Sequence, residues 1–252
     1  MSRIAARDLT VEQDGIPGFI AHPEAPGKHP GVMFLHSANG VSSELKIYAA
    51  DLAAAGYVAF VPSLFQMLGF EGTPGLPGAP PSYVGLGVEA QKQFGDDAFL
   101  GVIGTAWQCL TARADTDAGR CGVIGYCMGG RLAIPFAADT PALRAMVLYY
   151  ASIRDEPTSA MRPRHAFDLA KTLKCASMVF CGGCDYICTP AIQRRLWESF
   201  VANGSPLEWH YYSHGNHGFA SPDTAGYQPE LARETWPMVG KFLEHHLRIP
   251  QR

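Results

Sequence analysis

Cys127 stands in a sequence frame that suits a reactive thiol. The run from Gly122 to Gly130 reads Gly-Val-Ile-Gly-Tyr-Cys-Met-Gly-Gly, so glycines lie two positions before and two positions after Cys127. Such glycines let the main chain turn sharply from a strand into a helix and hold a side chain up for attack. No serine and no other cysteine of the chain has glycine at both positions. The frame therefore predicts a sulfur nucleophile that attacks a carbonyl carbon.

Asp185 and His217 are the candidate partners of this thiol. A sulfur nucleophile needs a base that takes its proton, and the base needs a group that orients it. Asp185 follows the apolar run 176–181, and His217 follows the run 207–212. The order nucleophile, acid, histidine is that of α/β-hydrolases, and the carboxyl ends of parallel strands meet at one sheet edge. We expect the three side chains to meet there, with Cys127 at the positive end of a helix that favours a thiolate.

Simpler interpretations of these residues stay open. Cysteine is often a buried structural residue, and Asp185 could merely stabilise a turn. His214 could replace His217 as the base, although the context His-Gly-Phe favours His217. The run Cys181-Gly-Gly-Cys184, with Cys188 and His214 nearby, also allows a redox or zinc site, but a lone C-x-x-C motif is weak.

Short apolar runs alternate with longer amphipathic segments along the chain, which predicts a mostly parallel sheet with helices on both faces. One α/β domain accounts for residues 1–252. We expect strands at about 5–12, 17–21, 31–36, 57–62, 120–126, 145–151, 176–181 and 207–212. We expect helices at 44–55, 88–112 with a break near Gly95 or Gly101, 129–138 with a kink at Pro135, 165–173, 190–203 and 230–247.

The segment 63–87 departs from this alternation. It is rich in Gly and Pro and carries large side chains such as Phe65 and Tyr83. A long irregular segment within a compact domain is usually functional or mobile, so we expect an active-site wall or lid. A variable surface loop is the alternative.

Several of these motifs resemble the dienelactone hydrolase family, a cysteine branch of the α/β-hydrolase fold. The likeness rests on Gly-Tyr-Cys127-Met-Gly-Gly, on the loop of Asp185 and on His217-Gly-Phe, and it runs from about residue 31 to residue 219 with a weaker part at 63–99. It implies Cys127 as nucleophile, His217 as base and Asp185 as the group that orients it. It also implies an oxyanion hole made by the backbone N–H groups of Met128 and Ala38, the latter from the loop 36–40.

The chain departs from the family pattern where the family binds its anionic substrate. A Gln-Glu pair of the family, whose glutamate helps to activate the cysteine, is matched here by His36-Ser37. The family's arginine four residues beyond the catalytic histidine is Ser221 here, and no arginine stands between Arg7 and Arg113. Charged hydrogen bonds to a carboxylate contribute about 1.5–3 kcal/mol each, so a neutral or apolar ester or lactone suits this chain better than dienelactone.

These observations predict a cysteine hydrolase of esters or lactones that works through a thioacyl-enzyme and needs no metal or organic cofactor. The expected pocket includes His36, Ser37, Phe65, Tyr83 and Ser221. The same fold acting on a thioester or an organophosphate ester is an alternative, and so is a catalytically silent protein that binds a small ligand.

Composition narrows the classes of partner. The formal net charge of −3 argues against a nucleic-acid binder, and no apolar run approaches the roughly 20 residues of a membrane span. The first eight residues lack the apolar core of an export signal, and seven cysteines is an odd number for a disulfide framework. We therefore expect a cytoplasmic protein with free thiols, a monomer or small homo-oligomer, whose partner is a small-molecule substrate.

Overall fold

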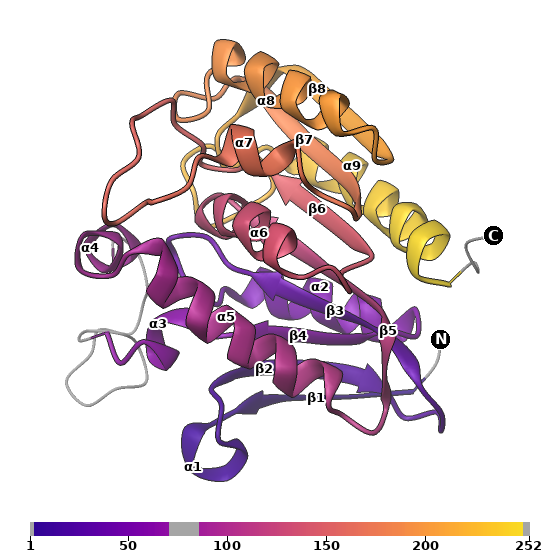
Figure 1. Ribbon diagram of the computed structural model, residues 1–252. Helices are drawn as coiled ribbons and strands as arrows, with labels where there is room; N and C mark the ends of the chain where they lie inside the picture. Colours follow the sequence, from indigo (N-terminus) through magenta and orange to yellow (C-terminus); the bar gives the residue numbers. More distant parts are fainter. Residues whose placement is uncertain (1–2, 71–85, 249–252) are drawn as a thin grey trace.

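Eight strands form one sheet in the order β1-β2-β4-β3-β5-β6-β7-β8 (Figure 1). The structure is a computed structural model and describes residues 3–70 and 86–248. The strands are β1 (Ile4–Leu9), β2 (Gly18–Pro23), β3 (His29–Leu35), β4 (Val58–Pro62), β5 (Thr116–Tyr126), β6 (Ala145–Tyr149), β7 (Ala176–Cys184) and β8 (Leu207–Asn216).

The strands from β3 onward are parallel, whereas β1 and β2 run antiparallel to their neighbours at one edge. The central strands β3, β5 and β6 are apolar along most of their length because helices cover both faces of the sheet. This architecture is the α/β-hydrolase fold, and it confirms the fold class that the alternating pattern predicts. It also brings the carboxyl ends of β3, β5, β7 and β8 to one edge.

Helices pack on the two faces of the sheet in two separate apolar clusters. They are α1 (Val11–Asp14), α2 (Ser43–Ala54), α3 (Leu64–Met67), α4 (Leu86–Gln93), α5 (Asp96–Thr111), α6 (Met128–Asp139), α7 (Ala166–Ala170), α8 (Pro190–Asn203) and α9 (Pro229–Leu243), followed by a π-helical turn at Glu244–Arg248. Side chains of α5, α6, α7 and α8 form the core on one face, and those of α2 and α9 form the core on the other. In the part of the chain that the structure describes, no helix is both long and apolar enough to cross a bilayer.

The expected elements are present, with shifted ends that have local causes. The first strand ends at Leu9 rather than near residue 12, because Thr10 caps the short helix α1 and Gly15 ends it at φ 71°. The predicted helix 88–112 is two helices, α4 and α5, that separate at Gly95 and not at Gly101. A Cβ atom at Gly95 would lie 3.1 Å from the carbonyl oxygen of Met161, so the break accommodates a crossing segment.

The segment 63–87 is irregular only in part. Leu64–Met67 forms the short helix α3, and Leu64 and Phe65 are fully buried in the core. Residue 86 already begins α4. The rest of the expected wall or lid, residues 71–85, lies outside the described residues, and Tyr83 lies there with it.

Candidate active site

The chain turns sharply at Cys127, between the end of β5 and the start of α6. Cys127 has φ 51°, a backbone conformation that residues other than glycine rarely adopt. Its N–H donates to the carbonyl of Tyr149 at 3.0 Å, and its carbonyl accepts the N–H groups of Arg131 and Ser152, both at 3.0 Å. These three backbone bonds hold the strained turn in place.

Glycine is required on both sides of this turn. A Cβ atom at Gly125 would lie 2.6 Å from the carbonyl oxygen of Gly129, and one at Gly129 would overlap the carbonyl of Leu35 on β3. Any larger residue would push α6 away from the sheet. The glycine frame in the sequence therefore reflects close backbone contact in the fold.

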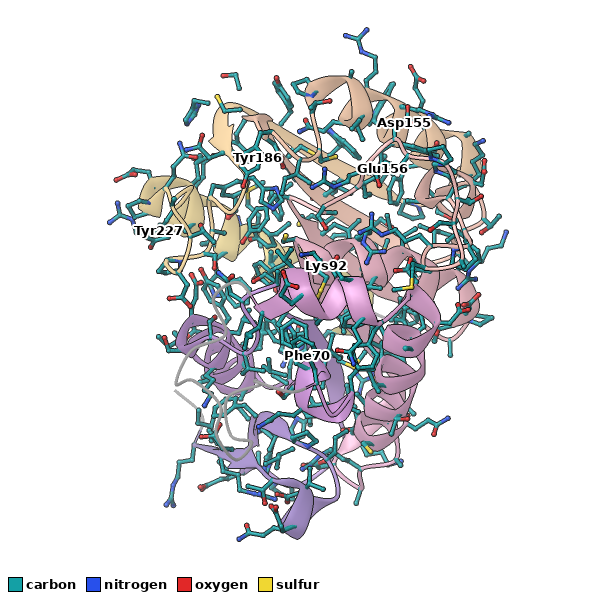
Figure 2. All side chains as sticks on the ribbon, turned by 90° about the vertical axis from the view of Figure 1, so that its left-hand side faces the viewer. Phe70, Lys92, Asp155, Glu156, Tyr186 and Tyr227 are labelled. Carbon is teal, nitrogen blue, oxygen red and sulfur yellow. The ribbon has the colours of Figure 1, made fainter. Side chains whose placement is uncertain are left out.

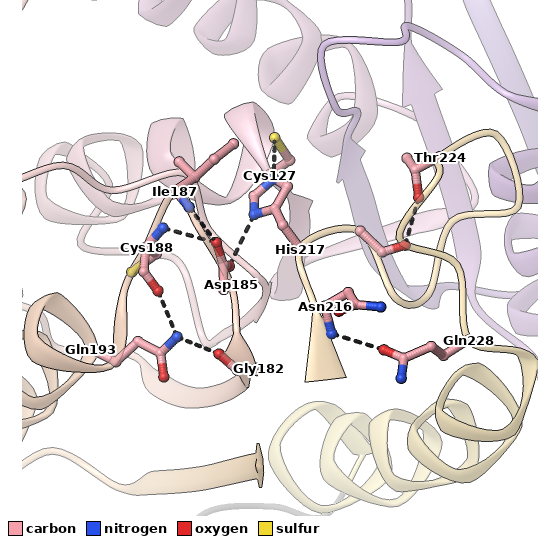
Figure 3. A network of polar contacts seen from close by, with 11 residues as sticks. Cys127, Gly182, Asp185, Ile187, Cys188, Gln193, Asn216, His217, Thr224 and Gln228 are labelled. Atoms are coloured by element: carbon pink, nitrogen blue, oxygen red, sulfur yellow. Dashed lines mark hydrogen bonds and ion pairs between the residues drawn. The ribbon is translucent and has the colours of Figure 1, made fainter. Parts of the chain in front are cut away.

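Cys127, His217 and Asp185 form a hydrogen-bonded line (Figure 3). His217 Nε2 lies 3.1 Å from the Sγ of Cys127, and His217 Nδ1 lies 2.9 Å from Oδ2 of Asp185. The carboxylate accepts the proton on Nδ1, which leaves Nε2 facing the thiol. The side chains of His217 and Asp185 are 8% and 1% exposed, so little water competes with these bonds.

The loop after β7 fixes the position of the Asp185 carboxylate. Oδ1 accepts the backbone N–H groups of Ile187 at 2.8 Å and Cys188 at 2.9 Å, and Oδ2 is left for His217. Gln193 of α8 ties this loop together by donating to the carbonyls of Gly182 and Cys188. Asp185 thus has a structural anchor on one oxygen and a histidine on the other.

The loop after β8 presents His217 rather than His214. The side chain of Gln228 accepts the N–H of Asn216 at 2.8 Å and donates to the carbonyl of His214 at 2.9 Å. Gly218 follows His217 at φ 85°, and the hydroxyl of Thr224 donates to its carbonyl at 2.9 Å. His214 itself is exposed, so the structure places His217, and not this rival base, beside the thiol.

The electrostatics of the line favour a charged imidazole. Burial by itself lowers the pKa of His217, but the hydrogen bonds to Asp185 and Cys127 and the charges of both outweigh it, and the pKa is raised from 6.5 to about 9. At neutral pH this arrangement favours an imidazolium that faces sulfur on one side and carboxylate on the other. The imidazolium is then a proton donor that lies beside the sulfur.

Two backbone N–H groups next to Cys127 could stabilise an oxyanion. Met128 is the first residue of α6, so its N–H has no partner earlier in the helix. Ala38 lies in the loop after β3 and lines the cavity in front of Cys127. Its carbonyl accepts the N–H of Gly87 at 3.1 Å, which fixes this loop against α4.

The dienelactone hydrolase family model matches residues 16–247. The chain belongs to the dienelactone hydrolase family. It is similar to a protein of Methylorubrum extorquens that carries the provisional name carboxymethylenebutenolidase, with 30% identity over 93% of this chain and 78% of that protein. It is also similar to a provisionally named 2-oxo-3-(5-oxofuran-2-ylidene)propanoate lactonase of Bradyrhizobium, with 26% identity over 95% of this chain and 93% of the relative.

A solved structure agrees with this assignment. The crystal structure of a provisionally named dienelactone hydrolase from Klebsiella pneumoniae superimposes with a TM-score of 0.82 at 25% identity, over 96% of this chain and 99% of the other. The protein is therefore a hydrolase of the dienelactone hydrolase type.

A cavity of about 480 Å³ opens in front of Cys127 and His217 in this family member. Ser37 and Ser221, two of the residues expected in the pocket, line it together with Ala38. No Asp, Glu, Lys or Arg is among the described residues that line it. Apart from Cys127 and His217, its walls are uncharged and mostly apolar.

His36 and Phe65, also expected in the pocket, lie in the core instead. His36 is fully buried, donates from Nδ1 to the carbonyl of Ser37 at 2.7 Å and accepts the N–H of Leu64 on Nε2 at 3.1 Å. Burial lowers its pKa to about 4 even though the bond to Ser37 opposes the shift, so the ring is neutral. Its ring packs against Phe65 with centroids 4.8 Å apart, and it joins the end of β3 to α3.

Tyr150 and Tyr186 are pocket residues that the sequence reasoning did not identify. Tyr150 follows β6 at φ 36°, is buried, and packs its ring edge-on against His217 with centroids 5.4 Å apart. Tyr186 is 79% exposed and lies 5.9 Å from the same imidazole. In the sequence, Tyr149-Tyr150 belongs to the expected strand 145–151 and to the family resemblance, neither of which indicates that the second ring faces a histidine.

The cysteines that suggested a metal or redox site differ in their exposure to solvent. Cys181 and Cys188 are buried, whereas Cys184 is exposed at the mouth of the cavity, and all three are free thiols. Burial raises the pKa of Cys188 to about 12, and the charge of Asp185 adds to this effect. Over residues 3–70 and 86–248, no group of three His, Cys, Asp or Glu side chains is arranged to hold a metal ion.

Proposed function

We propose that this chain hydrolyses carboxylic esters or lactones through a thioacyl-enzyme formed on Cys127. His217 acts as general acid and base, and Asp185 orients it. The observation that supports this most is the pair of distances, 3.1 Å from sulfur to Nε2 and 2.9 Å from Nδ1 to carboxylate. These are hydrogen-bond distances between groups whose chemistry is complementary.

Acylation begins with attack of the Cys127 thiolate on the carbonyl carbon. The carbonyl oxygen becomes an oxyanion, for which the N–H groups of Met128 and Ala38 are the candidate donors. When the tetrahedral intermediate collapses, the bond from carbon to the leaving oxygen breaks. His217 gives its Nε2 proton to that oxygen, and the alcohol departs.

Deacylation uses the same imidazole as a base. Once the sulfur is part of a thioester it carries no charge and no longer raises the pKa of His217, so Asp185 alone opposes the effect of burial, and the pKa falls. Nε2 can then take a proton from water as the water attacks the thioester carbon. The acid is released, and the imidazolium and thiolate are restored.

This arrangement compensates for the carboxylate that Ser37 replaces. Nε2 of His217 lies 3.1 Å from the sulfur, so the imidazole itself can take the thiol proton. Asp185, anchored by Ile187 and Cys188, keeps that imidazole in place. We infer that a separate activating glutamate is not needed here.

The part of the substrate beside His217 is neutral in this proposal. The cavity that holds His217 has no charged side chain among its described lining residues, and Ser221 stands where relatives of the family place an arginine. A carboxylate placed there would lose its water without gaining an arginine or lysine as partner. An apolar or aromatic leaving group suits these walls.

Substitution of Cys127 tests the proposal. Cys127→Ala should lower kcat/KM for p-nitrophenyl acetate about a thousandfold or more, because it removes the sulfur that lies beside Nε2 of His217. Iodoacetamide should inactivate the wild type.

Cys184→Ala is the matched control, because Cys184 is a second exposed thiol that lines the same cavity. It should keep both the activity and the sensitivity to iodoacetamide. Activity that survives in Cys127→Ala would refute a sulfur nucleophile. Complete absence of turnover in the wild type would indicate a protein that only binds ligands.

A further inference from the structure

The space in front of Cys127 has a second arm with a different character. This arm has a volume of about 320 Å³ and shares Ala38, Val88, Cys127 and Ile187 with the first cavity. Its own walls are charged, and they include Lys92, Arg154, Glu156 and Arg162. In Figure 2, Glu156 on the loop after β6 lies to the right of Tyr186, and Lys92 on α4 lies below both.

The charges of this second arm do not balance. It has three cationic side chains and one carboxylate, Glu156, which lies 3.3 Å from Arg162 and 4.0 Å from Arg154. Lys92 has its own partner in Glu89 at 2.7 Å. Arg154 makes no hydrogen bond with any described residue, and half of its side chain is exposed. Its guanidinium is therefore available to a ligand.

A third guanidinium, that of Arg131, lies close to Arg162 behind the arm. Burial lowers the pKa of Arg162, the nearby charges of Arg131 and Arg154 lower it further, and Asp96 and Glu156 oppose the shift. Arg131 is nearly buried and is already paired with Asp96 at 2.6 Å. Guanidinium groups that crowd one another in this way are stabilised by an additional anion.

The position of His217 decides which end of a substrate enters this arm. The leaving oxygen must receive a proton from Nε2, so the leaving group has to lie on the side of His217. His217 lines the uncharged cavity and is not among the described residues of the charged arm. The acyl chain, on the other side of the carbonyl carbon, therefore extends toward Arg154.

We propose that the charged arm selects substrates whose acyl chain ends in a carboxylate, which Arg154 binds together with Arg162. The substrate class is then a half-ester of a dicarboxylic acid, with a free carboxylate on the acyl side and a neutral leaving group. This proposal rests on the proposed function and specifies its substrate. The planar fork of an arginine matches both oxygens of a carboxylate, which a lysine does less well.

Hydrolysis of such a half-ester needs water as its only co-substrate. The thiolate displaces the neutral alcohol, which takes the proton of His217, and water then cleaves the thioester. The products are the alcohol and a free dicarboxylate. The sequence predicts a neutral substrate. In this proposal only the leaving group is neutral, and the acyl part carries a charge.

Two matched aryl esters test this assignment. Mono-p-nitrophenyl glutarate and p-nitrophenyl pentanoate share the leaving group and the chain length but differ in the terminal charge. Arg154→Ala should lower kcat/KM for the glutarate about ten- to a hundredfold, mainly through KM, and leave the pentanoate within about twofold. Arg154→Lys should restore part of the loss.

The control is Arg233→Ala, which removes the same charge from the exposed surface of α9, where Arg233 pairs with Glu230. This variant should leave kcat/KM unchanged for both esters. As a readout without turnover, glutarate should protect the Cys127 thiol from iodoacetamide in the wild type and fail to do so in Arg154→Ala.

The outcomes separate the two proposals. If Arg154→Ala changes kcat/KM equally for both esters, or for neither, the charged arm does not bind the acyl carboxylate. The proposed function would still stand, because it depends on Cys127. Turnover of both esters by Cys127→Ala would overturn the proposed function and this inference with it.

Discussion

Replacement of Asp185 by asparagine removes the negative charge beside His217 and keeps the size and shape of the side chain. The Oδ1 position can still accept the N–H groups of Ile187 and Cys188, so the loop should keep its shape. The amide nitrogen would then face Nδ1 of His217 in place of a carboxylate oxygen. Two donors cannot share that contact, so Nδ1 must lose its proton, and Nε2 then carries one toward the thiol.

The size of the effect follows from the pKa of His217. Asp185 and Cys127 together raise it from 6.5 to about 9 against the effect of burial. Without the carboxylate, burial dominates, and we expect the pKa to fall by on the order of 2 units. Each unit is a factor of ten in the equilibrium constant for proton transfer from sulfur to the imidazole. Because the tautomer also changes, kcat/KM at neutral pH should fall by roughly a hundredfold or more.

The assay is kcat/KM for p-nitrophenyl acetate as a function of pH. In the wild type the rate should fall as pH rises through about 9, because His217 then lacks the proton that the leaving group needs. In Asp185→Asn this alkaline limb should move to lower pH. Asp168→Asn is the control, since Asp168 is an exposed carboxylate paired with Lys171. A loss of less than about threefold with an unmoved alkaline limb would refute the reasoning.

Two further predictions concern the scaffold. Gly129→Ala should lower the free energy of unfolding by about 1–3 kcal/mol in urea titrations, because its Cβ would overlap the carbonyl of Leu35, whereas Gly101→Ala on α5, with open space around it, should raise it by about 0.5–1 kcal/mol. Equal effects at the two sites would contradict this. The pKa of His36 is about 4 in the folded chain and 6.5 when unfolded, so its stabilising contribution is present above pH 6.5 and is lost as pH falls toward 4, by about 3 kcal/mol. His36→Gln should flatten that dependence in unfolding measurements across this range, and an unchanged slope would mean that the ring is not buried as a neutral group.

The sequence was informative where backbone geometry restricts the residue type. Glycine is needed at 125 because the start of α6 lies against β5 there, and at 129 because α6 approaches the end of β3. Asp185 and His217 follow apolar strands whose order in the sheet is predictable, so their meeting could be expected. The alternation of short apolar runs with amphipathic segments predicts the sheet and its helices, because buried strands and half-buried helices need these patterns.

Side-chain direction was not predictable in the same way. His36 comes directly after a buried strand, as a pocket residue would, but its ring turns into the core and binds the start of α3. Arg154 and Arg162 belong to the irregular segment between β6 and α7, which has no periodicity that could place them beside Cys127. Only the folded path of that segment reveals the charged arm.

Trapping the acyl group is the most direct test of the central claim. After rapid mixing of the enzyme with p-nitrophenyl acetate and quenching in acid, intact-protein and peptide mass spectrometry should find one acetyl group, on Cys127, bound as a thioester that hydroxylamine removes. The Cys184→Ala protein should show the same adduct. A burst of product with the acetyl group on another residue, or steady turnover with no acetylated Cys127 at any time, would contradict the account.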